Sequence, residues 1–243
     1  MAIIATVLNV VAGILTIVMA IVYTAAFVTA VDESTKESTV AESPAAEAEE
    51  PAAAPAAEVQ ELAVGETAFG IDAETGWGWF AVEIENPNPD HIFNDGFTVE
   101  AYDAAGVLVD SDSSYITVMS GRTMIVGNFM QLGTAAIDHI EVRGPMAAGA
   151  TSSPAGETGS MTVGNITTAM EYDWMTVTGQ VTSTFAEDQE MVRIDLVARN
   201  ENGVIIGVDF TYLDRLPAGG TAQFEVGYWK VPAGSVIEAY PHV

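Results

Sequence analysis

Short stretches in which apolar and polar residues alternate recur through residues 64–243. Residues 80–85 read FAVEIE and residues 97–102 read FTVEAY, each with a period of two. This period is typical of strands with one buried face. The same pattern predicts strands at residues 107–109, 115–119, 123–126 and 137–142. Because turn residues separate the segments and none carries a long stripe of period 3.6, we expect a mostly β chain built as antiparallel sandwiches.

The second half of this region repeats the first. Four segments align at nearly one offset, which is 97 for the first three: 80–86 with 177–183, 97–99 with 194–196, 106–109 with 203–206, and the turn 120–123 with 218–221 after a small change in length. Such internal similarity predicts tandem copies of one fold. We therefore expect two β-sandwich domains, at residues 64–146 and 160–243, joined by a linker at 147–159.

The chain begins with a different pattern. Residues 1–31 contain no charged side chain, and residues 3–31 are apolar almost throughout. As a helix this run would span roughly 40 Å, more than the roughly 30 Å of a bilayer's hydrocarbon core. A buried core helix and a cleaved signal peptide are the alternatives, but the run is too long for the first and lacks the basic flank of the second. The pattern predicts an uncleaved transmembrane anchor helix within residues 1–31, which contacts the membrane through residues 3–31.

Residues 32–63 consist mostly of Glu, Ala, Ser and Pro, with nine acidic residues and one lysine, Lys36. Such a segment repels itself and has little to bury, so we expect a disordered, extended stalk. Lys36 is the only basic residue near the predicted helix, and it marks the orientation of the helix weakly. We expect the acidic, cysteine-free remainder to lie outside the cell, anchored at the cell surface.

A hairpin in the first copy and a strand in the second carry a family resemblance. Residues 97–106, FTVEAYDAAG, follow a strand that ends at Asn86, and residues 177–181, VTGQV, match that upstream strand in the second copy. These segments resemble the FxLYD domain of bacterial and archaeal cell-envelope proteins, although residues 196–203 lack the Tyr-Asp pair of the hairpin. The resemblance implies an extracytoplasmic, immunoglobulin-like β-sandwich and implies no catalytic residue.

Composition excludes several classes of function. The chain has 34 acidic residues, 7 basic residues and no cysteine, for a formal charge of −27. A disulfide scaffold, a cysteine nucleophile and an iron–sulfur site are impossible, and a nucleic-acid surface is not expected. The excess of acidic residues has two interpretations. It keeps a surface protein soluble, or it marks a host that lives at high salt, where the repulsion between the charges is screened. Because the chain contains no nucleophile elbow, metalloprotease helix or phosphate loop, we expect no enzyme activity, no catalytic residue and no cofactor-binding residue.

Calcium is the one ligand for which the sequence offers candidate residues. Oxygen-bearing side chains gather in two predicted loops, and the candidate ligands are Asp90, Asn94, Asp95, Asp110 and Asp112. Calcium takes several oxygen ligands on flexible loops. Asn and Asp also favour turns for purely local reasons, and neither loop has the EF-hand spacing.

Aromatic residues offer a second candidate surface. Trp77 and Trp79 precede the strand at 80–85, and Tyr228 and Trp229 lie late in the second copy. They could form a platform for a sugar or a protein partner, or they could fill a core or the contact between domains.

Two functions therefore remain open, beside a third hypothesis of a hydrolase that substrate screening with and without calcium would test. The first is a membrane-anchored extracytoplasmic binding or structural module that displays two β-sandwiches to an unknown protein or cell-envelope partner. The second is a pilin-like filament subunit, which self-assembles by packing its N-terminal helix in a filament core.

Overall fold

A computed structural model describes residues 58–72, 74–154 and 158–243. The predicted membrane helix at 3–31 and most of the predicted stalk lie outside the described residues. Within them, no helix has the length and apolar character needed to cross a membrane. Residues from Ala56 to Val243 form one compact unit.

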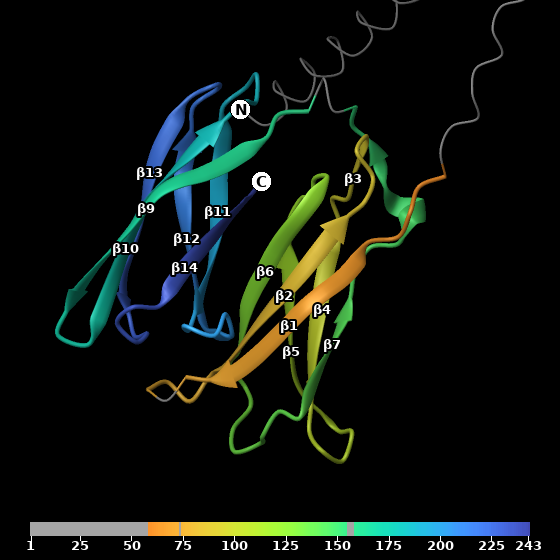
Figure 1. Ribbon diagram of the computed structural model, residues 1–243. Helices are drawn as coiled ribbons and strands as arrows, with labels where there is room; N and C mark the ends of the chain where they lie inside the picture. Colours follow the sequence, from red (N-terminus) through yellow and green to blue (C-terminus); the bar gives the residue numbers. More distant parts are fainter. Residues whose placement is uncertain (1–57, 73, 155–157) are drawn as a thin grey trace, which may run out of the picture. The chain divides into compact units, whose positions relative to one another are not determined.

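The first half of this unit, which we call sandwich 1, contains two three-stranded antiparallel sheets (Figure 1). One sheet has the order β1 (Ala63–Ile71), β2 (Gly78–Asn86), β6 (Gly121–Phe129). The other has the order β5 (Leu108–Tyr115), β4 (Gly96–Tyr102), β7 (His139–Arg143). A short pair, β3 (His91–Ile92) with β8 (Thr151–Ser152), and a 3₁₀ turn at Ala147–Gly149 complete it.

The second half, sandwich 2, has the same strand order. One sheet consists of β9 (Met161–Glu171), β10 (Trp174–Ser183) and β13 (Thr221–Trp229), with β10 in the middle. The other consists of β12 (Ile205–Leu216), β11 (Gln189–Arg199) and β14 (Val236–His242), with β11 in the middle. The prediction of a mostly β chain is thus confirmed, and the internal similarity in sequence corresponds to a repeated sheet topology.

Each sandwich encloses its own apolar core because alternate residues of its strands point inward. In sandwich 1 the sheets meet through Phe80, Val82 and Ile84 of β2 and Phe97 and Val99 of β4, all of which are buried. In sandwich 2 the corresponding residues come from β10, β11 and β13, and they include Val177, Ile194, Leu196 and Phe224.

The hairpin equivalence predicted from the sequence extends to its hydrogen bonds. Asp103 Oδ1 accepts the backbone N–H groups of Ala105 and Val107, both at 2.9 Å. In the second copy Asn200 Oδ1 accepts those of Asn202 and Val204, at 2.9 and 3.1 Å. Each turn then passes through a glycine at positive φ, Gly106 at 75° and Gly203 at 80°. An amide therefore replaces a carboxylate without changing the turn, because either oxygen can accept both N–H groups.

Several predicted boundaries differ from the structure. The strand expected at 115–119 is wrong: β5 covers Leu108–Tyr115, and beyond it only an isolated bridge joins Val118 to Phe93. The turn alignment is shifted by one residue, since pairing with β2 and β10 places Gly121 and Gly220 in equivalent positions. β1 and β9 have no counterpart among the predicted strands, because Gly, Thr and Glu interrupt their apolar alternation.

Both predicted connecting segments contain ordered parts. At the end of the predicted stalk, Val59 and Leu62 pack against the core of sandwich 1. In the predicted linker, residues 151–152 form β8 on β3, and Ala147 N donates to Glu61 Oε2 at 2.8 Å. Sandwich 1 therefore begins before residue 63 and continues beyond residue 146.

The two sandwiches share a third apolar cluster. Ala81, Met124 and Val126 on the outer face of β2 and β6 are buried against Val197 and Ile205 of sandwich 2. Partly buried residues surround this contact: Ala68, Trp79, Val208, Phe210 and Tyr240. The outer face of one sheet of sandwich 1 is thus packed on the outer face of the sheet β12–β11–β14.

Candidate ligand-binding cleft

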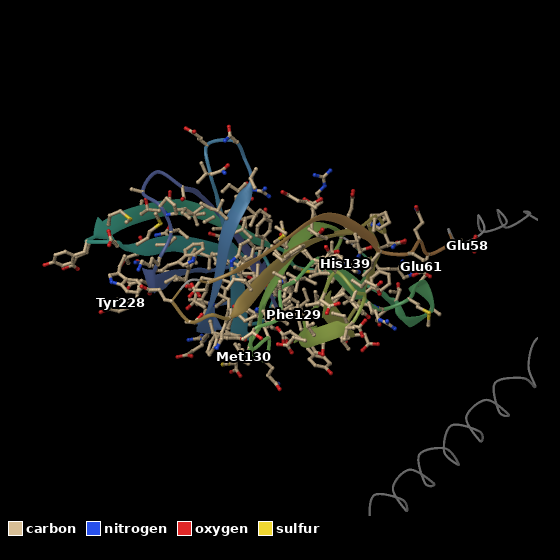
Figure 2. All side chains as sticks on the ribbon, turned by 90° about the horizontal axis from the view of Figure 1, so that it is seen from below. Glu58, Glu61, Phe129, Met130, His139 and Tyr228 are labelled. Atoms are coloured by element: carbon tan, nitrogen blue, oxygen red, sulfur yellow. The ribbon has the colours of Figure 1, made fainter. Side chains whose placement is uncertain are left out.

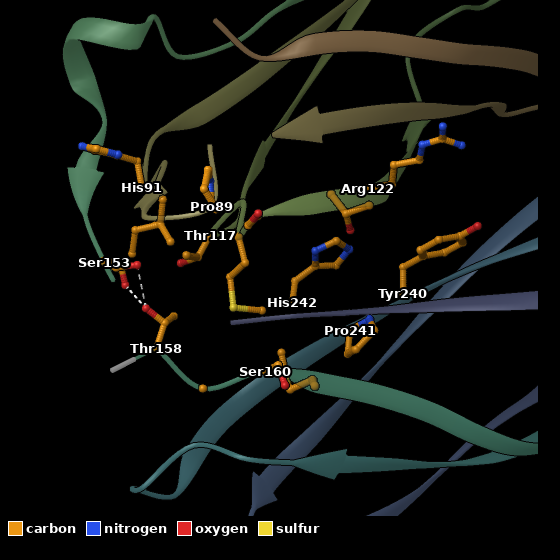
Figure 3. A pocket seen from close by; sticks show the side chains of 16 residues that line it. Pro89, His91, Thr117, Arg122, Ser153, Thr158, Ser160, Tyr240, Pro241 and His242 are labelled. Carbon is orange, nitrogen blue, oxygen red and sulfur yellow. Dashed lines mark hydrogen bonds between the residues drawn. The ribbon is translucent and has the colours of Figure 1, made fainter. Parts of the chain in front are cut away.

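A cavity of about 290 Å³ lies at one end of the contact between the sandwiches (Figure 3). Its walls come from four separate parts of the chain: residues 89–92, residues 117–123, residues 153–161 apart from the undescribed 155–157, and residues 240–242. A pocket between two domains is a common place for a small ligand. We call this cavity the cleft.

Hydroxyl groups and nitrogen-bearing side chains dominate the polar lining of the cleft. The hydroxyl-bearing lining residues are Thr117, Ser120, Thr123, Ser153, Thr158, Ser160 and Tyr240. His91, Arg122 and His242 add ring and guanidinium nitrogens, and Met119 and Met161 add apolar surface. No aspartate or glutamate is among the described lining residues, although the whole chain carries 34 acidic residues. The described lining of the cleft therefore offers hydrogen-bond donors with no carboxylate among them, although the neighbouring Asp90 and Asp195 carboxylates lie 2.9 Å from the His91 ring and 3.4 Å from the His242 ring.

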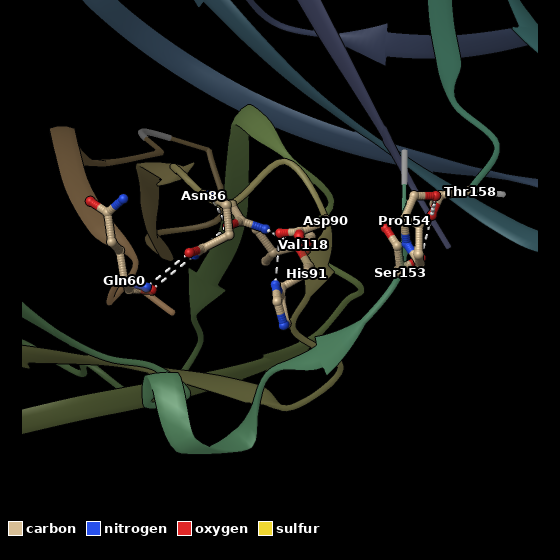
Figure 4. A network of polar contacts seen from close by, with 9 residues as sticks. Gln60, Asn86, Asp90, His91, Val118, Ser153, Pro154 and Thr158 are labelled. Carbon is tan, nitrogen blue, oxygen red and sulfur yellow. Dashed lines mark hydrogen bonds and ion pairs between the residues drawn. The ribbon is translucent and has the colours of Figure 1, made fainter. Parts of the chain in front are cut away.

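Two buried asparagines hold one wall of the cleft in place (Figure 4). Asn86 Nδ2 donates to the carbonyl oxygens of His91 at 2.8 Å and Val118 at 3.3 Å. Asn86 Oδ1 accepts Asn88 N at 3.0 Å, and Asn88 in turn exchanges two hydrogen bonds with the backbone of Gln60. The Asn-Pro-Asn-Pro segment that ends β2 therefore fixes three chain segments, which preorganises the His91 wall.

A cluster of ionisable side chains next to the cleft joins the sandwiches; Asp195 and His242 are buried and Arg193 is partly buried. β6 is the outer strand of its sheet, so its outward backbone groups need partners. Asp195 Oδ2 accepts Val126 N at 3.1 Å, Arg193 donates to the Val126 carbonyl at 2.7 Å, and His242 Nε2 donates to the Met124 carbonyl at 3.0 Å. We call Arg193, Asp195 and His242 the edge lock.

Within the edge lock the charges are paired. Arg193 Nε lies 2.6 Å from Asp195 Oδ1, and the Asp195 side chain is fully buried. Burial by itself would lower the pKa of Arg193, but the neighbouring Asp195 carboxylate outweighs this and raises that pKa above its usual value. His242 Nε2 also lies 3.4 Å from Asp195 Oδ2. Because each group depends on the others, removing one would leave a buried charge without its partner.

Tyr240 carries a second contact between the sandwiches. Its hydroxyl donates to Glu238 Oε2 at 2.9 Å, and the same carboxylate oxygen accepts Arg199 Nε at 2.9 Å. Burial, together with the bond to Glu238, raises the pKa of Tyr240 to about 12. Arg199 also binds both carboxylate oxygens of Glu66 on β1, and these hydrogen bonds raise its pKa further above the ordinary range. Tyr240 is thus held as a neutral donor at the edge of the cleft.

The candidate calcium ligands lie in two places. Asp90, Asn94 and Asp95 flank β3. Asp90 Oδ1 lies 2.9 Å from His91 Nδ1, within hydrogen-bond distance of the ring. Asp110 and Asp112 lie on β5, where their Oδ2 atoms accept the backbone N–H groups of Gln131 at 2.7 Å and Asn128 at 3.3 Å. Among the residues that the structure describes, no group of three or more His, Cys, Asp or Glu side chains is arranged to hold a metal ion. The calcium hypothesis stays a prediction, and Asp110 and Asp112 have a structural use as acceptors at the strand edge.

The aromatic candidates separate into different environments. Trp229 is in the core of sandwich 2, and Trp79 packs in the contact between the sandwiches. Trp77 is 45% exposed and Tyr228 is 83% exposed. The alternation around residue 79 favoured packing for Trp79, but no feature of the sequence analysis singled out Tyr172, which is 91% exposed, or Trp174 beside Tyr228.

Comparisons with known proteins assign no family to this chain. No family model matches it, and no curated protein matches it. Among solved structures, a transglutaminase from red sea bream covers 76% of this chain and 29% of its own length, at 10% identity and a TM-score of 0.27. A β-glucuronidase from Bacteroides uniformis covers 75% of this chain and 28% of its own, at 10% identity and a TM-score of 0.20. Since the chain spans under a third of either protein and both TM-scores are low, neither likeness carries a functional argument.

Proposed function

We propose that this protein is a membrane-anchored, extracytoplasmic binding module that captures a small anionic ligand in the cleft. The anchor is the apolar segment 3–31, the spacer is the acidic segment that follows it, and the binding part is the pair of immunoglobulin-like sandwiches. The resemblance of residues 97–106 and 177–181 to FxLYD domains supports the same placement outside the cytoplasm.

The observation that carries the ligand class is the composition of the cleft. In a chain of charge −27, its described lining has hydroxyls, imidazoles and one guanidinium, and no carboxylate. The His242 ring and the Tyr240 hydroxyl already donate to the Met124 carbonyl and to Glu238, so the donors for a ligand are Arg122 and hydroxyls of the lining such as those of Ser120 and Thr123. A carboxylate or phosphate group accepts hydrogen bonds from these groups, and a bond to a charged group contributes about 1.5–3 kcal/mol. Arg122 Nε lies 4.0 Å from a carboxylate oxygen of Glu83 and 3.9 Å from one of Glu85. Neither contact is a close two-point ion pair, so the Arg122 guanidinium can turn to a ligand.

Binding can be tested on the detergent-solubilised full chain with inorganic phosphate and citrate as probes at constant ionic strength. We expect a rise in melting temperature and a calorimetric Kd of about 1 mM or tighter for at least one probe. Arg122→Gln should weaken that binding about tenfold or more. Arg215→Gln is the matched control, because Arg215 is similarly exposed (63%) and pairs with Asp188, which does not line the cleft. Equal binding by both variants, or no binding by the unmodified chain, would contradict the ligand class.

The anchor half of the proposal needs a separate measurement. We expect the full chain to stay with membranes after a high-salt wash, to leave them in detergent as small particles, and to be cleaved by protease added to intact cells. Long fibres by negative-stain microscopy would instead support the pilin-like alternative. Release into the aqueous phase on cell breakage would refute both.

A further inference from the structure

The two sandwiches differ in what covers one pair of equivalent sheet faces. In sandwich 1 the outer face of β1–β2–β6 is buried against sandwich 2 through Ala81, Met124 and Val126. The equivalent face of sandwich 2 is the outer face of β9–β10–β13, and within the part of the chain that the structure describes none of the apolar clusters covers it. The pairing of strands shows which outward residues are equivalent. The cross-strand pair Ala81–Val126 of sandwich 1 corresponds to Thr178–Glu225 of sandwich 2, so Ala81 is equivalent to Thr178. In the same way Glu83–Met124 corresponds to Gln180–Gln223, so Met124 is equivalent to Gln223. We call this uncovered surface the threonine face.

The threonine face is built from neutral hydrogen-bonding side chains. Its residues on the three strands are Thr162, Asn165, Thr167, Thr176, Thr178, Gln180, Thr182, Thr221 and Gln223. Cross-strand hydrogen bonds fix them in place: Thr167 to Thr178 at 2.7 Å, Thr182 to Thr221 at 2.9 Å, and Asn165 to Gln180 at 2.8 Å. The face also includes two acids, Glu171 and Glu225. Apart from Ala169 and the aromatic residues at one end, it lacks the apolar side chains that fill the core of a protein–protein interface.

Aromatic side chains stand at one end of this face. Trp174 begins β10, and its ring meets that of Tyr228 edge to face, with centroids 6.4 Å apart. Lys230 Nζ lies 5.5 Å from the centre of the Trp174 ring, a cation–π contact that helps to fix it. Tyr172 occupies the adjacent β9–β10 turn, and Tyr228 lies at the outer end of sandwich 2 (Figure 2).

Both exposed tyrosines adopt backbone conformations that disfavour them. Tyr172 has φ of 54° in a two-residue turn, and Tyr228 has φ of 59° in a bulge where Gly227 and Tyr228 oppose Thr176 alone. A bulky residue at positive φ costs about 1–3 kcal/mol, and glycine would avoid this cost. Burial cannot explain the choice of tyrosine, because the two side chains are 91% and 83% exposed. A bulge re-aims a side chain, and here it directs an aromatic ring into solvent.

We propose that the threonine face and its aromatic end form a docking surface for a neutral polysaccharide chain, a second site independent of the cleft. Aromatic rings contact the apolar faces of sugar rings, while hydroxyl and amide groups exchange hydrogen bonds with sugar hydroxyls. A neutral ligand needs no opposite charge on a chain of −27, whereas a polyanion would be repelled. β10 has 10 residues, about 33 Å at 3.3 Å per residue, which is long enough for several sugar rings in a row.

Retention on insoluble cellulose and chitin, and affinity electrophoresis in soluble mannan, test this proposal with the detergent-solubilised full chain. We expect binding to at least one of the three, and about a tenfold loss or more in Trp174→Ala and in the double variant Tyr172→Ala, Tyr228→Ala. Tyr115→Ala is the matched control, since Tyr115 is 81% exposed on sandwich 1 and should leave binding unchanged. Binding should not depend on Arg122, which separates this result from that of the cleft.

Stability separates a role in binding from a role in folding. Tyr172→Gly and Tyr228→Gly should raise the melting temperature, because they relieve positive φ, and should lose binding nonetheless. Absence of binding to all three polysaccharides, or equal binding by the variants and the control, would overturn the proposal. So would a dimer that forms with rising concentration and dissolves in the double tyrosine variant, because the face would then dock a second copy.

Discussion

Sandwich 1 and sandwich 2 share a strand order and differ on their outer faces. The inward positions of β2 and β10 are apolar in both copies except at the strand ends, Asn86 and Ser183, and at Gly179, where the Phe224 ring takes the place of a side chain. By contrast, the outward-facing Ala81 and Met124 of sandwich 1 correspond to the outward-facing Thr178 and Gln223 of sandwich 2. A repeated fold therefore fixes the inward residues, because each core must be filled, and leaves the outward residues free to diverge. The buried outer face joins the two copies, and the exposed one is available to a partner.

The sheets β5–β4–β7 and β12–β11–β14 form the other pair of equivalent faces, and their polar side chains also differ. Sandwich 1 has Tyr102 and Arg143 on one carboxylate, Glu100, and sandwich 2 has Tyr240 and Arg199 on Glu238. The donors have exchanged strands: Tyr102 lies on β4 with its glutamate, while Tyr240 lies with its glutamate on β14. The sandwich 1 triad is at the surface, and only the sandwich 2 triad gains a further ion pair across the contact, to Glu66. Similar chemistry thus serves a surface in one copy and an interface in the other.

The largest expected effect concerns the edge lock. Asp195→Ala leaves the partly buried Arg193 guanidinium and the buried Val126 N–H without their acceptor, so we expect the free energy of unfolding to fall by about 3–5 kcal/mol. Thr98 is the equivalent position in sandwich 1, and Thr98→Ala should change stability by about 0.5 kcal/mol or less. Urea denaturation of both variants measures the difference. A loss under about 1 kcal/mol for Asp195→Ala would show that the lock does not hold the sandwiches together.

The next effect exchanges the two outer faces. Met124→Gln places an amide in the apolar contact without a partner, and we expect a loss of about 2–3 kcal/mol. Gln223→Met makes the reverse change on the threonine face and should alter stability by about 0.5 kcal/mol or less. Denaturation curves test both variants. A similar loss in the two would mean that the faces are not distinguished by burial.

These expectations depend on residues that the sequence reveals to different degrees. The inward positions and the hairpins were predictable, since burial on one face imposes a period of two and glycine avoids the strain of positive φ in the turns at Gly106 and Gly203. β5 was misjudged because its residues, LVDSDSSY, are mostly Asp and Ser, and pairing with β4 holds them in a strand regardless. Asp195 carried a signal that could have been used, a charge among the apolar residues Ile194, Leu196 and Val197. The cleft had none, because its walls come from four distant segments and follow no motif.

A smaller effect tests whether the two hairpins are equivalent. Asp103→Ala and Asn200→Ala each remove one oxygen that accepts two backbone N–H groups, and we expect each to cost about 1 kcal/mol. The two costs should agree within about 0.5 kcal/mol, since the acceptors occupy the same place in the two turns. Thermal and urea unfolding give both values. A cost that is large in one copy and absent in the other would show that the carboxylate and the amide are not interchangeable here.

The smallest effect is a pH dependence that distinguishes the two tyrosine triads. The pKa of Tyr240 is about 12 in the folded protein, against about 10 for an unfolded chain, so folding favours the protonated hydroxyl. Its contribution is complete below about pH 10 and is lost as pH rises through 12. The stability difference between the unmodified chain and Tyr240→Phe should therefore shrink over that window. Tyr102→Phe should show a weaker dependence, because Tyr102, whose pKa is also raised by its bond to Glu100, lies at the surface where solvent screens the carboxylate. Urea denaturation at a series of pH values checks both variants, and equal pH dependence in the two would mean that burial at the contact between the sandwiches does not set the protonation of Tyr240.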